Sequence, residues 1–473
     1  MLPSAMTSIL RPLVRRPLAL VVRAVVLVLW TSAAPAQTTL TLPLAEARAL
    51  ATQALLAGDP GLAVDIAADL VAADPADRAA LLVLAGALPM LDRARDGRLA
   101  GARAYALSAT DAEKYEAARL TALAAANEGR FTLAQWWLRR ALTVAPTEQD
   151  AAQTITDAQG LRRINPWSSS VELSFAPSDN VNGGAATRFN VIDGVPVVGL
   201  LSPDAQALSG WTGTLDLRSR YRLAAGADFQ TTVSARAYGR GVLLSDQAQA
   251  FLTAGGSDAT ANDFSTALLE FGLRHDRALS RGTYGLDLTL GQSWSGGDFD
   301  HTFLRLGADR RVPLSEASSL SFAGTLEQRW DQDDDPNEWR FGWQAGWTLA
   351  TDSGQLGVTL SQTDVRSERV NDTGVTRTAQ VSYAFARPWG PAQVQVAAGV
   401  QWQDFDDYRV GFIAVPGGRQ DQRLFGSVDL FFADTSYAGF APVVTLSAGQ
   451  TDSNVSRFAR SDLSVGFAFR STF

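Results

Sequence analysis

The hydrophobic and polar positions of the chain alternate clearly at its C-terminal end. Val465, Phe467, Phe469, Ser471 and Phe473 occupy every second position, and the series includes the last residue. Successive side chains of a β-strand point to opposite faces, so this spacing places the aromatic rings on one side. A last strand with one apolar and one polar face is typical of an outer-membrane β-barrel, and we expect one here.

The same alternation recurs through residues 166–473, where Gly, Ser, Thr and aromatic residues are frequent. The outward candidates of three such runs are Trp339, Phe341, Trp343, Ala345, Trp347 and Leu349; Tyr284, Leu286, Leu288 and Leu290; and Val394, Val396, Ala398, Val400 and Trp402. Small or polar residues stand between them. Trp330, Trp339, Trp347, Trp389 and Trp402 lie at or near predicted strand ends, as the interfacial girdles of a membrane barrel require. A soluble sandwich also alternates, but it does not need aromatic residues at its strand ends.

We expect about fourteen strands of roughly ten residues each, the length of a tilted membrane-spanning strand. They lie near 168–177, 210–222, 227–239, 263–275, 282–292, 302–312, 318–330, 338–350, 354–363, 374–387, 391–403, 420–433, 439–450 and 461–473. The predicted connections are long after strands one, three and eleven, and moderate after five, seven, nine and thirteen. Those after the even-numbered strands are short. Long external loops and short periplasmic turns are expected of such barrels, and an even strand count returns both barrel ends to the periplasm.

Residues 37–165 have a different composition, rich in Ala, Leu, Asp and Arg, which predicts helices. The spacing of Ala63, Leu70 and Pro75 repeats in Ala134, Ala141 and Pro146, and it resembles the second helix and terminal proline of tetratricopeptide repeats. A generic alanine-rich helical bundle is the alternative interpretation. In either case this is a helical interaction module, in which we assign client binding to the repeat positions together with Trp136 and Trp137.

The first thirty-six residues are typical of an export signal. Four arginines precede the short apolar run AVVLVLW, and Ala34, Pro35 and Ala36 form a small-x-small cleavage site. No later stretch has the roughly twenty apolar residues of a transmembrane helix. With no cysteine, the mature chain has neither a lipid-anchoring thiol nor disulfides. The domains are therefore predicted as a signal peptide over 1–36, a periplasmic helical domain over 37–165 and a barrel over 166–473.

Several other classes of function are disfavoured. The net charge of -8 argues against a nucleic-acid partner, which needs a basic surface. Neither GxSxG nor a Walker sequence occurs, so we expect no enzyme and no cofactor. His275 and His301 are the only histidines, too few and too separated for a zinc site. The acidic run at Asp331 to Pro336 could bind calcium, but a solvated external loop is the more common meaning of such a run.

Two similar segments follow the first and the thirteenth predicted strands. They contain Ser178, Asp179 and Asn180, and Asp452, Ser453 and Asn454. In a closed barrel the first and last strands pair, so both segments are expected beside that seam. Ordinary turn chemistry explains them equally well. The hypothesis is that they help to close or open the seam.

The ending GFAPVVTLSAGQTDSNVSRFARSDLSVGFAFRSTF resembles the C-terminus of the surface lipoprotein assembly modulator (Slam) family. The segment VELSFAPSDNVNGG, which starts at Val171, is similar to that family's first barrel strand and its DSN-type loop, with Ser178 and Asp179 in reversed order. Tetratricopeptide-like repeats before a fourteen-stranded barrel also match the family's layout.

This resemblance implies an outer-membrane translocator that delivers lipoproteins, or related secreted proteins, from the periplasm to the cell surface. Its partners would be that client, the lipid bilayer and the outer-membrane barrel-assembly machinery, for which Phe467, Phe469 and Phe473 would be the assembly signal. The alternative is an export porin for polysaccharide or small solutes. Its inward candidates Arg236, Arg240, Glu270, Arg274, Asp287 and Gln401 form a mixed-charge lining that fits either function.

Overall fold

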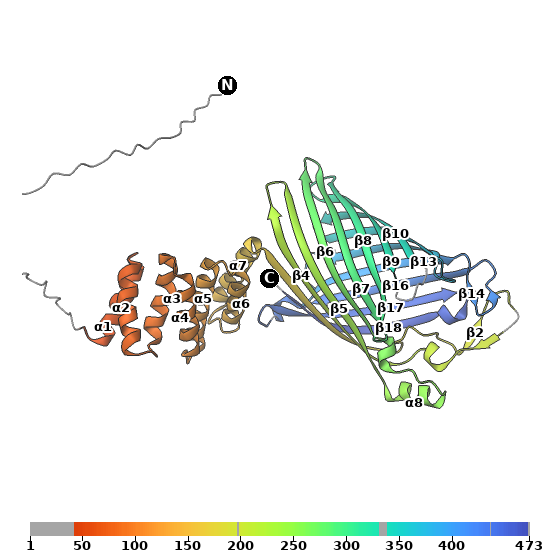
Figure 1. The fold of residues 1–473 in the computed structure, drawn as a ribbon, viewed down its shortest axis with the longest axis horizontal. Coiled ribbons are helices and arrows are strands. Elements are labelled where there is room, and N and C mark those ends of the chain that lie inside the picture. The colour runs from red at the N-terminus through yellow and green to blue at the C-terminus, as the bar shows by residue number, and fades with distance from the viewer. Residues whose placement is uncertain (1–41, 196–197, 331–337, 436, 472–473) are drawn as a thin grey trace, which may run out of the picture.

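The computed structural model describes residues 42–195, 198–330, 338–435 and 437–471. Within these residues, seven helices are followed by a closed β-barrel, and the two parts lie end to end (Figure 1). This confirms the predicted fold class of a helical region followed by a barrel of about fourteen strands. The last of these helices ends at Ile164 and the first strand begins at Trp167. The predicted signal peptide lies outside the described residues.

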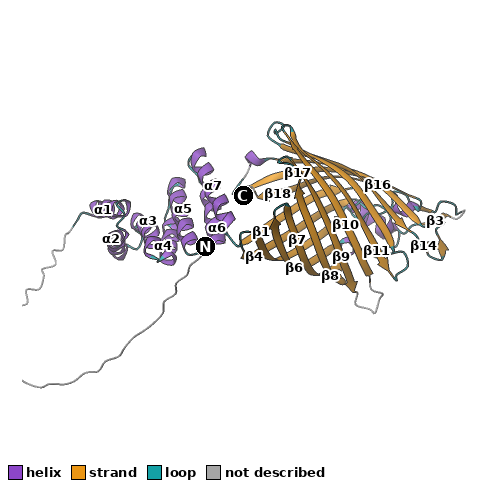
Figure 2. Cartoon of the chain, turned by 90° about the horizontal axis from the view of Figure 1, so that it is seen from above, coloured by secondary structure: helices purple, strands orange, loops and turns teal. Residues whose placement is uncertain are grey.

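The N-terminal helices form a row in which each helix packs on the next (Figure 2). They are α1 (Leu44–Leu56), α2 (Pro60–Ala73), α3 (Arg78–Ala87), α4 (Ala94–Ala106), α5 (Asp111–Asn127), α6 (Phe131–Leu142) and α7 (Glu148–Ile164), with a short 3-10 turn, η1 (Leu88–Leu91), after α3. Side chains of Asp59, Thr110 and Thr147 cap α2, α5 and α7 by accepting hydrogen bonds from backbone N–H groups. Gly58 and Gly129 have φ of 81° and 77° in the turns before α2 and α6, a conformation that favours glycine.

Small residues allow α4 and α5 to approach closely. A Cβ atom added at Gly101 would lie 2.4 Å from Oγ1 of Thr121, a fully buried side chain on α5. A Cβ atom added at Gly160 on α7 would have no described atom within 4 Å, apart from those of its own helix turn. Alanine normally stabilises a helix by about 1 kcal/mol over glycine. At Gly101 this gain is opposed by a steric clash that costs roughly 1–3 kcal/mol.

We therefore expect Gly101→Ala to destabilise the helical domain and Gly160→Ala to stabilise it slightly. Hydrogen exchange of peptides from 94–127 in the full chain measures the first effect, and peptides from 148–164 measure the second. Slower exchange around α4 and α5 in Gly101→Ala would contradict the close packing.

A pH dependence is expected from the ion pair between Arg98 on α4 and Glu128 after α5. Nε of Arg98 lies 2.5 Å from Oε2 of Glu128, and this hydrogen bond holds the pKa of Glu128 below its ordinary value of 4.5. A carboxyl whose pKa is lowered by folding stabilises the folded state above its ordinary pKa, and this contribution is lost as pH falls through the folded pKa. The protection of amides in α4 and α5, measured as the observed exchange rate relative to the intrinsic rate at each pH, should fall below about pH 4.5 in the wild type. Glu128→Gln should show the lower protection already at pH 7 and a smaller change with acid.

The barrel contains fourteen strands, each antiparallel to its neighbours. They are β1 (Trp167–Ser178), β4 (Gly210–Ala225), β5 (Phe229–Leu244), β6 (Thr266–Leu279), β7 (Gly282–Ser295), β8 (Asp298–Pro313), β9 (Ser318–Trp330), β10 (Glu338–Thr351), β11 (Gly354–Ser367), β12 (Gly374–Phe385), β13 (Gln393–Phe405), β16 (Arg419–Phe431), β17 (Phe440–Ser453) and β18 (Arg460–Ser471). The external connections carry two small hairpins, β2 (Phe189–Val191) with β3 (Val198–Leu200) and β14 (Arg409–Val410) with β15 (Ile413–Ala414). The external connections also contain helix α8 (Asp246–Ala254) and the 3-10 turns η2 (Pro203–Ala205), η3 (Ala261–Phe264) and η5 (Ser456–Phe458). A further 3-10 turn, η4 (Ala433–Thr435), follows β16.

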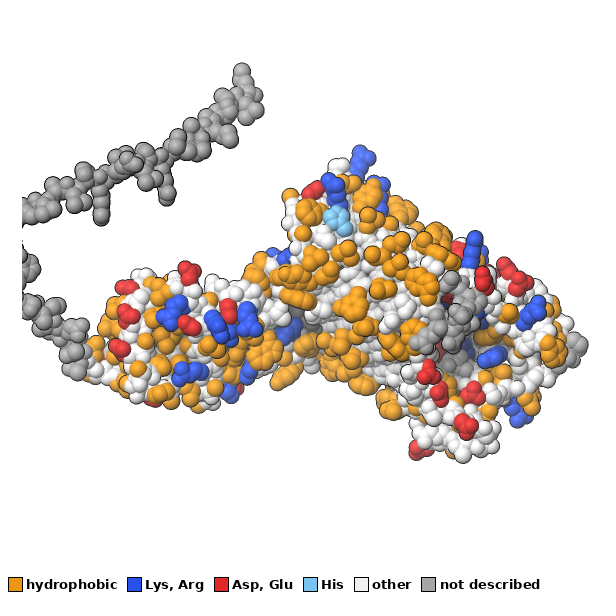
Figure 3. All heavy atoms as spheres, in the orientation of Figure 1, with side chains coloured by type: hydrophobic (Ala, Val, Ile, Leu, Met, Phe, Trp, Pro, Cys, Tyr) orange, Lys and Arg blue, Asp and Glu red, His pale blue; other side chains and the backbone are white. Residues whose placement is uncertain are grey.

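The strand registers place apolar side chains on the outer wall. Leu286, Leu288 and Leu290 are 60%, 41% and 50% exposed, while Asp287, between them, pairs with inward-facing Arg274. Hydrophobic side chains cover the barrel wall, and charged ones gather toward its ends (Figure 3). An apolar band on a closed barrel is the surface that a bilayer requires. The protein is an outer-membrane β-barrel.

The connections alternate in length largely as predicted, with the short turns at the end that carries the helical domain. In such barrels this is the periplasmic end. One prediction is wrong: the moderate loop expected after the fifth strand is the two-residue turn Gly296–Gly297. Both glycines have positive φ, which permits a tight hairpin, so β7 and β8 extend further than expected. The seventh connection, with its acidic run, lies outside the described residues.

Within the described residues, no helix combines the length and the apolar character needed to cross a membrane.

Candidate functional site: the lumen, the seam and the periplasmic junction

Charged side chains on one half of the inner wall form a continuous chain of ion pairs. Its consecutive members are Arg218, Asp216, Arg236, Glu270, Arg305, Glu327, Arg329, Glu338 and Arg340. Signs alternate along β4, β5, β6, β8, β9 and β10, so each carboxylate lies between two arginines. We call these nine residues the ion ladder. Asp216 and Glu327 are buried, and a buried charge is costly unless paired, so the ladder supplies the pairing that these two carboxylates require.

The inward faces of β11, β12 and β13 form a polar, uncharged part of the inner wall, and charged side chains return on β16 and β18 at Asp421, Arg423 and Asp462. Across β11 to β13 the inward residues are mainly Ser, Thr, Gln and Gly, as in the register pairs Ser361–Thr378 and Thr378–Gln401. Gln401 and Gln403 donate hydrogen bonds of 3.3 Å to Thr378 and Thr376. The predicted inward residues, Arg236, Arg240, Glu270, Arg274, Asp287 and Gln401, all belong to the inner face by register.

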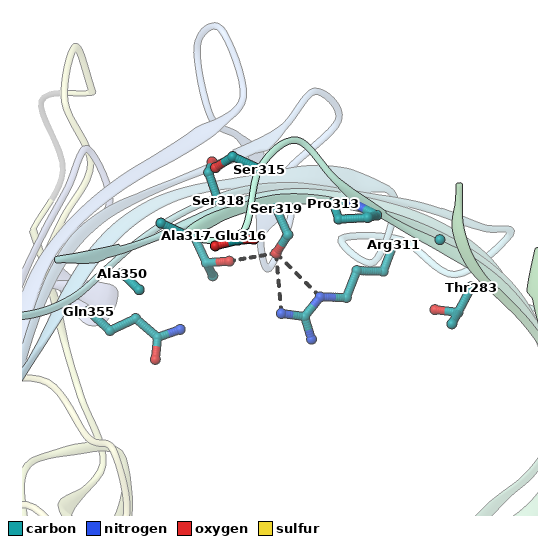
Figure 4. Close-up of a pocket in the computed structure, with 12 residues that line it drawn as sticks. Thr283, Arg311, Pro313, Ser315, Glu316, Ala317, Ser318, Ser319, Ala350 and Gln355 are labelled. Carbon is teal, nitrogen blue, oxygen red and sulfur yellow. Dashed lines mark hydrogen bonds between the residues drawn. The ribbon is translucent and has the colours of Figure 1, made fainter. Parts of the chain in front are cut away.

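A shallow hollow of about 420 Å³ lies at the periplasmic rim of the inner wall (Figure 4). Arg311 points across it and donates hydrogen bonds of 3.3 and 3.2 Å to Oγ of Ser319, which in turn lies 2.7 Å from Oγ1 of Thr348. Its lining combines Gly, Ala, Ser and Thr residues with the longer side chains of Arg311, Glu316 and Gln355. The hollow therefore continues the lumen wall to the periplasmic mouth.

At the external end, three loops share one apolar cluster. Ile192, Val415 and Val455, from residues 179–209, 406–418 and 454–459, are 4%, 5% and 0% exposed. Arg419 at the start of β16 borders them, with its guanidinium 3.3 Å from the ring centre of Phe458 and 2.5 Å from Oδ2 of Asp421. A second cluster joins Val181 and Leu208 to α8 through Ala248 and Leu252. These contacts tie the external loops to one another.

The β1–β18 seam is less completely paired than its neighbours. β1 pairs with β4 from Trp167–Tyr221 to Ser178–Gly210, but with β18 only at Ser174–Ala468, Phe175–Phe467 and Ser178–Ser464 among the described residues. Extending this register toward the periplasm would place Leu173 opposite Phe469, a pair that these described residues do not form. Pro177 interrupts the external half, because proline has no N–H to donate. The first and last strands thus pair as predicted, through a short ladder.

The helical domain joins the barrel beside this seam. Nη1 of Arg139 on α6 donates to the carbonyl oxygens of Ala438 and Gly439, at 3.0 and 3.3 Å, in the turn before β17. The Arg139 guanidinium also lies 4.6 Å from the ring centre of Phe440.

Two further side chains fix the connection between α7 and β1. Asn165 donates to Thr132 and Gln135 on α6 and accepts from the backbone N–H of Trp167. Arg222 on β4 donates to the carbonyls of Arg163 and Ile164, at the negative end of the α7 dipole. These contacts hold the last two helices against the periplasmic ends of β1, β4 and β17.

The predicted client-binding positions lie mostly inside the helical domain. Ala63, Leu70, Ala134, Trp137 and Ala141 are buried, which lets neighbouring helices approach closely. Pro75 and Pro146 are exposed in turns after α2 and α6. Trp136 is 48% exposed and is the member of this set whose ring can reach a partner directly. A client-binding role for the module stays a prediction, as does its assignment to tetratricopeptide repeats.

The residues of the two predicted seam loops form hydrogen bonds with different segments of the chain. Asn180 exchanges hydrogen bonds with the backbone of Gly184, within one external loop. Asn454 instead donates to the carbonyl of Gly418 and accepts from the N–H of Gln420, next to β16. Ser178 pairs with Ser464 at the seam, and Oγ of Ser453 accepts from the N–H of Val455. Asp179 and Asp452 flank these turns, and a role in opening the seam stays a prediction.

Phe467 and Phe469 point outward from β18 and are 51% and 54% exposed. Phe473 lies outside the described residues, and the assembly-signal role of the three residues stays a prediction.

Within the described part of the chain, no three His, Cys, Asp or Glu side chains gather as a metal site would require. His301 is 8% exposed and its Nδ1 lies 3.0 Å from Oδ2 of Asp300.

Comparison with protein-family models and with curated proteins gives no match. Among solved structures, the chain is similar to Acinetobacter baumannii OccAB3 (10% identity, 64% of this chain and 98% of that chain, TM-score 0.36) and Pseudomonas aeruginosa OprD (10%, 64% and 94%, 0.29). It is also similar to the KdgM porin (15%, 42% and 91%, 0.23). At these values the likenesses carry no information about what this chain transports.

Proposed function

We propose that the protein is an outer-membrane translocator that delivers lipoproteins, or related secreted proteins, from the periplasm to the cell surface. The observation that carries the proposal is the short β1–β18 ladder, which lies beside the attachment of the helical domain. Unpaired backbone groups cost several kcal/mol each in lipid, so a barrel opens most easily where the fewest ladder bonds must break. The seam is that place.

The lining of the lumen favours a lateral route for a lipid-anchored client. Keeping an acyl chain out of water is favourable by about 0.8 kcal/mol of free energy for each CH₂ group. The charged side chains of the ion ladder offer the acyl chain no apolar surface, so this free energy would be lost in the lumen. A lateral opening would keep the acyl chains in the bilayer while the polypeptide passes. The similarity of the C-terminal segment to the Slam family supports the same class of client.

The helical domain offers exposed apolar side chains that could hold a client before passage. Leu56, Met90 and Trp136 are 82%, 58% and 48% exposed. In this proposal, the module presents the client to the periplasmic half of the seam.

Protease shaving of intact cells tests the proposal. A lipoprotein encoded next to this chain is expressed with and without it, and its cleavage by external protease is measured. Cleavage that depends on the protein is expected. A client that is made but stays protected in both cases would argue against the proposal.

Export of a polysaccharide or small solute is the second candidate. The uncharged polar part of the lumen wall, on β11 to β13, favours it, because hydroxyl and amide groups suit the hydrogen bonding of sugars. Concentration-dependent block of single-channel current by a soluble polysaccharide would support this candidate.

A further inference from the structure

A cleft separates α6 and α7 from the periplasmic ends of β1, β17 and β18. It has a volume of about 490 Å³, within the usual range of ligand sites. A neighbouring hollow of about 620 Å³ runs along the start of α6. Thr132, Trp136, Asn165 and Trp167 line both, so the two spaces meet.

One side of the cleft is an extension of the lipid-facing wall. Trp167, Val171, Phe440 and Phe469 have outward register positions and are 50%, 52%, 36% and 54% exposed. Trp167 also packs on Tyr221 at the same end of the barrel, with ring centres 4.8 Å apart. Aromatic residues at the ends of a barrel wall are typical of the membrane interface. The cleft is therefore open to the lipids of the periplasmic leaflet.

The other side of the cleft is positively charged. Arg139 and Arg162 line it from the helices, and Arg470 reaches it from the inward face of β18. Glu172, also inward by register, is the one acidic residue among the described lining side chains. Burial, together with the nearby positive charge of Arg162, lowers the pKa of Arg139. Within the described part of the chain, no carboxylate forms an ion pair with Arg162. Two arginines that repel each other beside an apolar wall favour an anion between them.

We propose that this cleft binds one anionic phospholipid of the periplasmic leaflet, with its phosphate at Arg139 and Arg162 and its acyl chains along Trp167 and Phe469. The combination of charge and lipid-facing surface identifies the occupant. A zwitterionic headgroup would gain less from the arginines, and the uncharged acyl anchor of a lipoprotein would bring no negative charge to them. The inference does not depend on the proposed function, because it concerns the attachment of the helical domain and requires no client.

The test is lipid titration of the purified, delipidated full chain, followed by native mass spectrometry. Phosphatidylglycerol and phosphatidylcholine with identical acyl chains are compared, with glycerol phosphate as a probe without chains. We expect one phosphatidylglycerol to bind at least about tenfold more tightly than phosphatidylcholine, a difference of roughly 1.4 kcal/mol. Glycerol phosphate should bind far more weakly, because it cannot use the apolar wall.

Arg162→Gln is the decisive variant, since this exposed side chain makes no ion pair with any described residue, so its loss should not disturb the fold. It should lower the affinity for phosphatidylglycerol at least about fivefold and that for phosphatidylcholine by a smaller factor, because the choline cation offsets the charge of its phosphate. Arg163→Gln, the adjacent residue, which does not line the cleft, is the matched control and should bind like the wild type. Equal binding of the two lipids, or unchanged binding by Arg162→Gln, would overturn the proposal. Tight binding of glycerol phosphate would show a soluble anion site instead.

Discussion

A disulfide across the β1–β18 seam is expected to stop delivery of a client to the cell surface. Ser174 and Ala468 are register partners at the periplasmic end of the short ladder, and both side chains face the lumen. Directly opposed residues of antiparallel strands are close enough for a disulfide. The chain has no cysteine of its own, so Ser174→Cys with Ala468→Cys introduces a single possible bridge. Surface exposure of the client should fall at least about tenfold under oxidation, because a covalent bond cannot open within the lifetime of the assay.

The matched control places the same chemistry in a complete ladder. Ser382 and Ala397 are register partners of β12 and β13, again one serine and one alanine that face inward. Oxidation of Ser382→Cys with Ala397→Cys should leave client exposure unchanged, and a reductant should restore delivery in the seam variant. Full delivery through an oxidised seam would exclude the lateral route and leave the lumen as the path.

Period-two alternation was sufficient to predict the barrel strands, because each strand has lipid on one side. The runs around Trp339 and Leu286 have apolar residues at every outward position, so a shift of one residue would reverse the faces. The exception was the end of β7. The predicted strand ends at Gln292 and leaves Ser293 to Ser295 in a loop, although the following Gly296–Gly297 is a strong signal for a two-residue turn.

The candidate site could be predicted only in part, because its contacts join distant parts of the chain. The inward direction of Arg236 and Glu270 follows from alternation, but their ion pair depends on the register of β5 against β6. Arg139 contacts residues about three hundred positions later, and no local pattern indicates this. Pro177 within β1 was a usable signal: a proline inside a strand predicts incomplete pairing on one side.

Replacement of Glu327 is expected to cause the largest loss of barrel stability. This side chain is nearly buried at the centre of the ion ladder, where it accepts from Arg305 at 2.7 Å and from Arg329 at 2.6 Å. Glu327→Ala removes one negative charge and leaves two arginines facing each other. Breaking a buried ion pair by removing one partner costs about 3–5 kcal/mol. We expect a value near the lower limit, because Arg305 keeps Glu270 and Arg329 keeps Glu338.

Urea unfolding of the barrel in lipid vesicles, followed by the mobility of unboiled protein on a gel, measures this loss. Glu316→Ala, in the exposed turn between β8 and β9, removes the same charge from water and should change stability by less than about 0.5 kcal/mol. The double variant Glu327→Ala with Arg329→Ala should recover part of the loss, because it also removes one of the two unbalanced arginines. A single variant as stable as the wild type would mean that the ladder's charges are solvated in the lumen, and the wall would then be free to rearrange around a passing client.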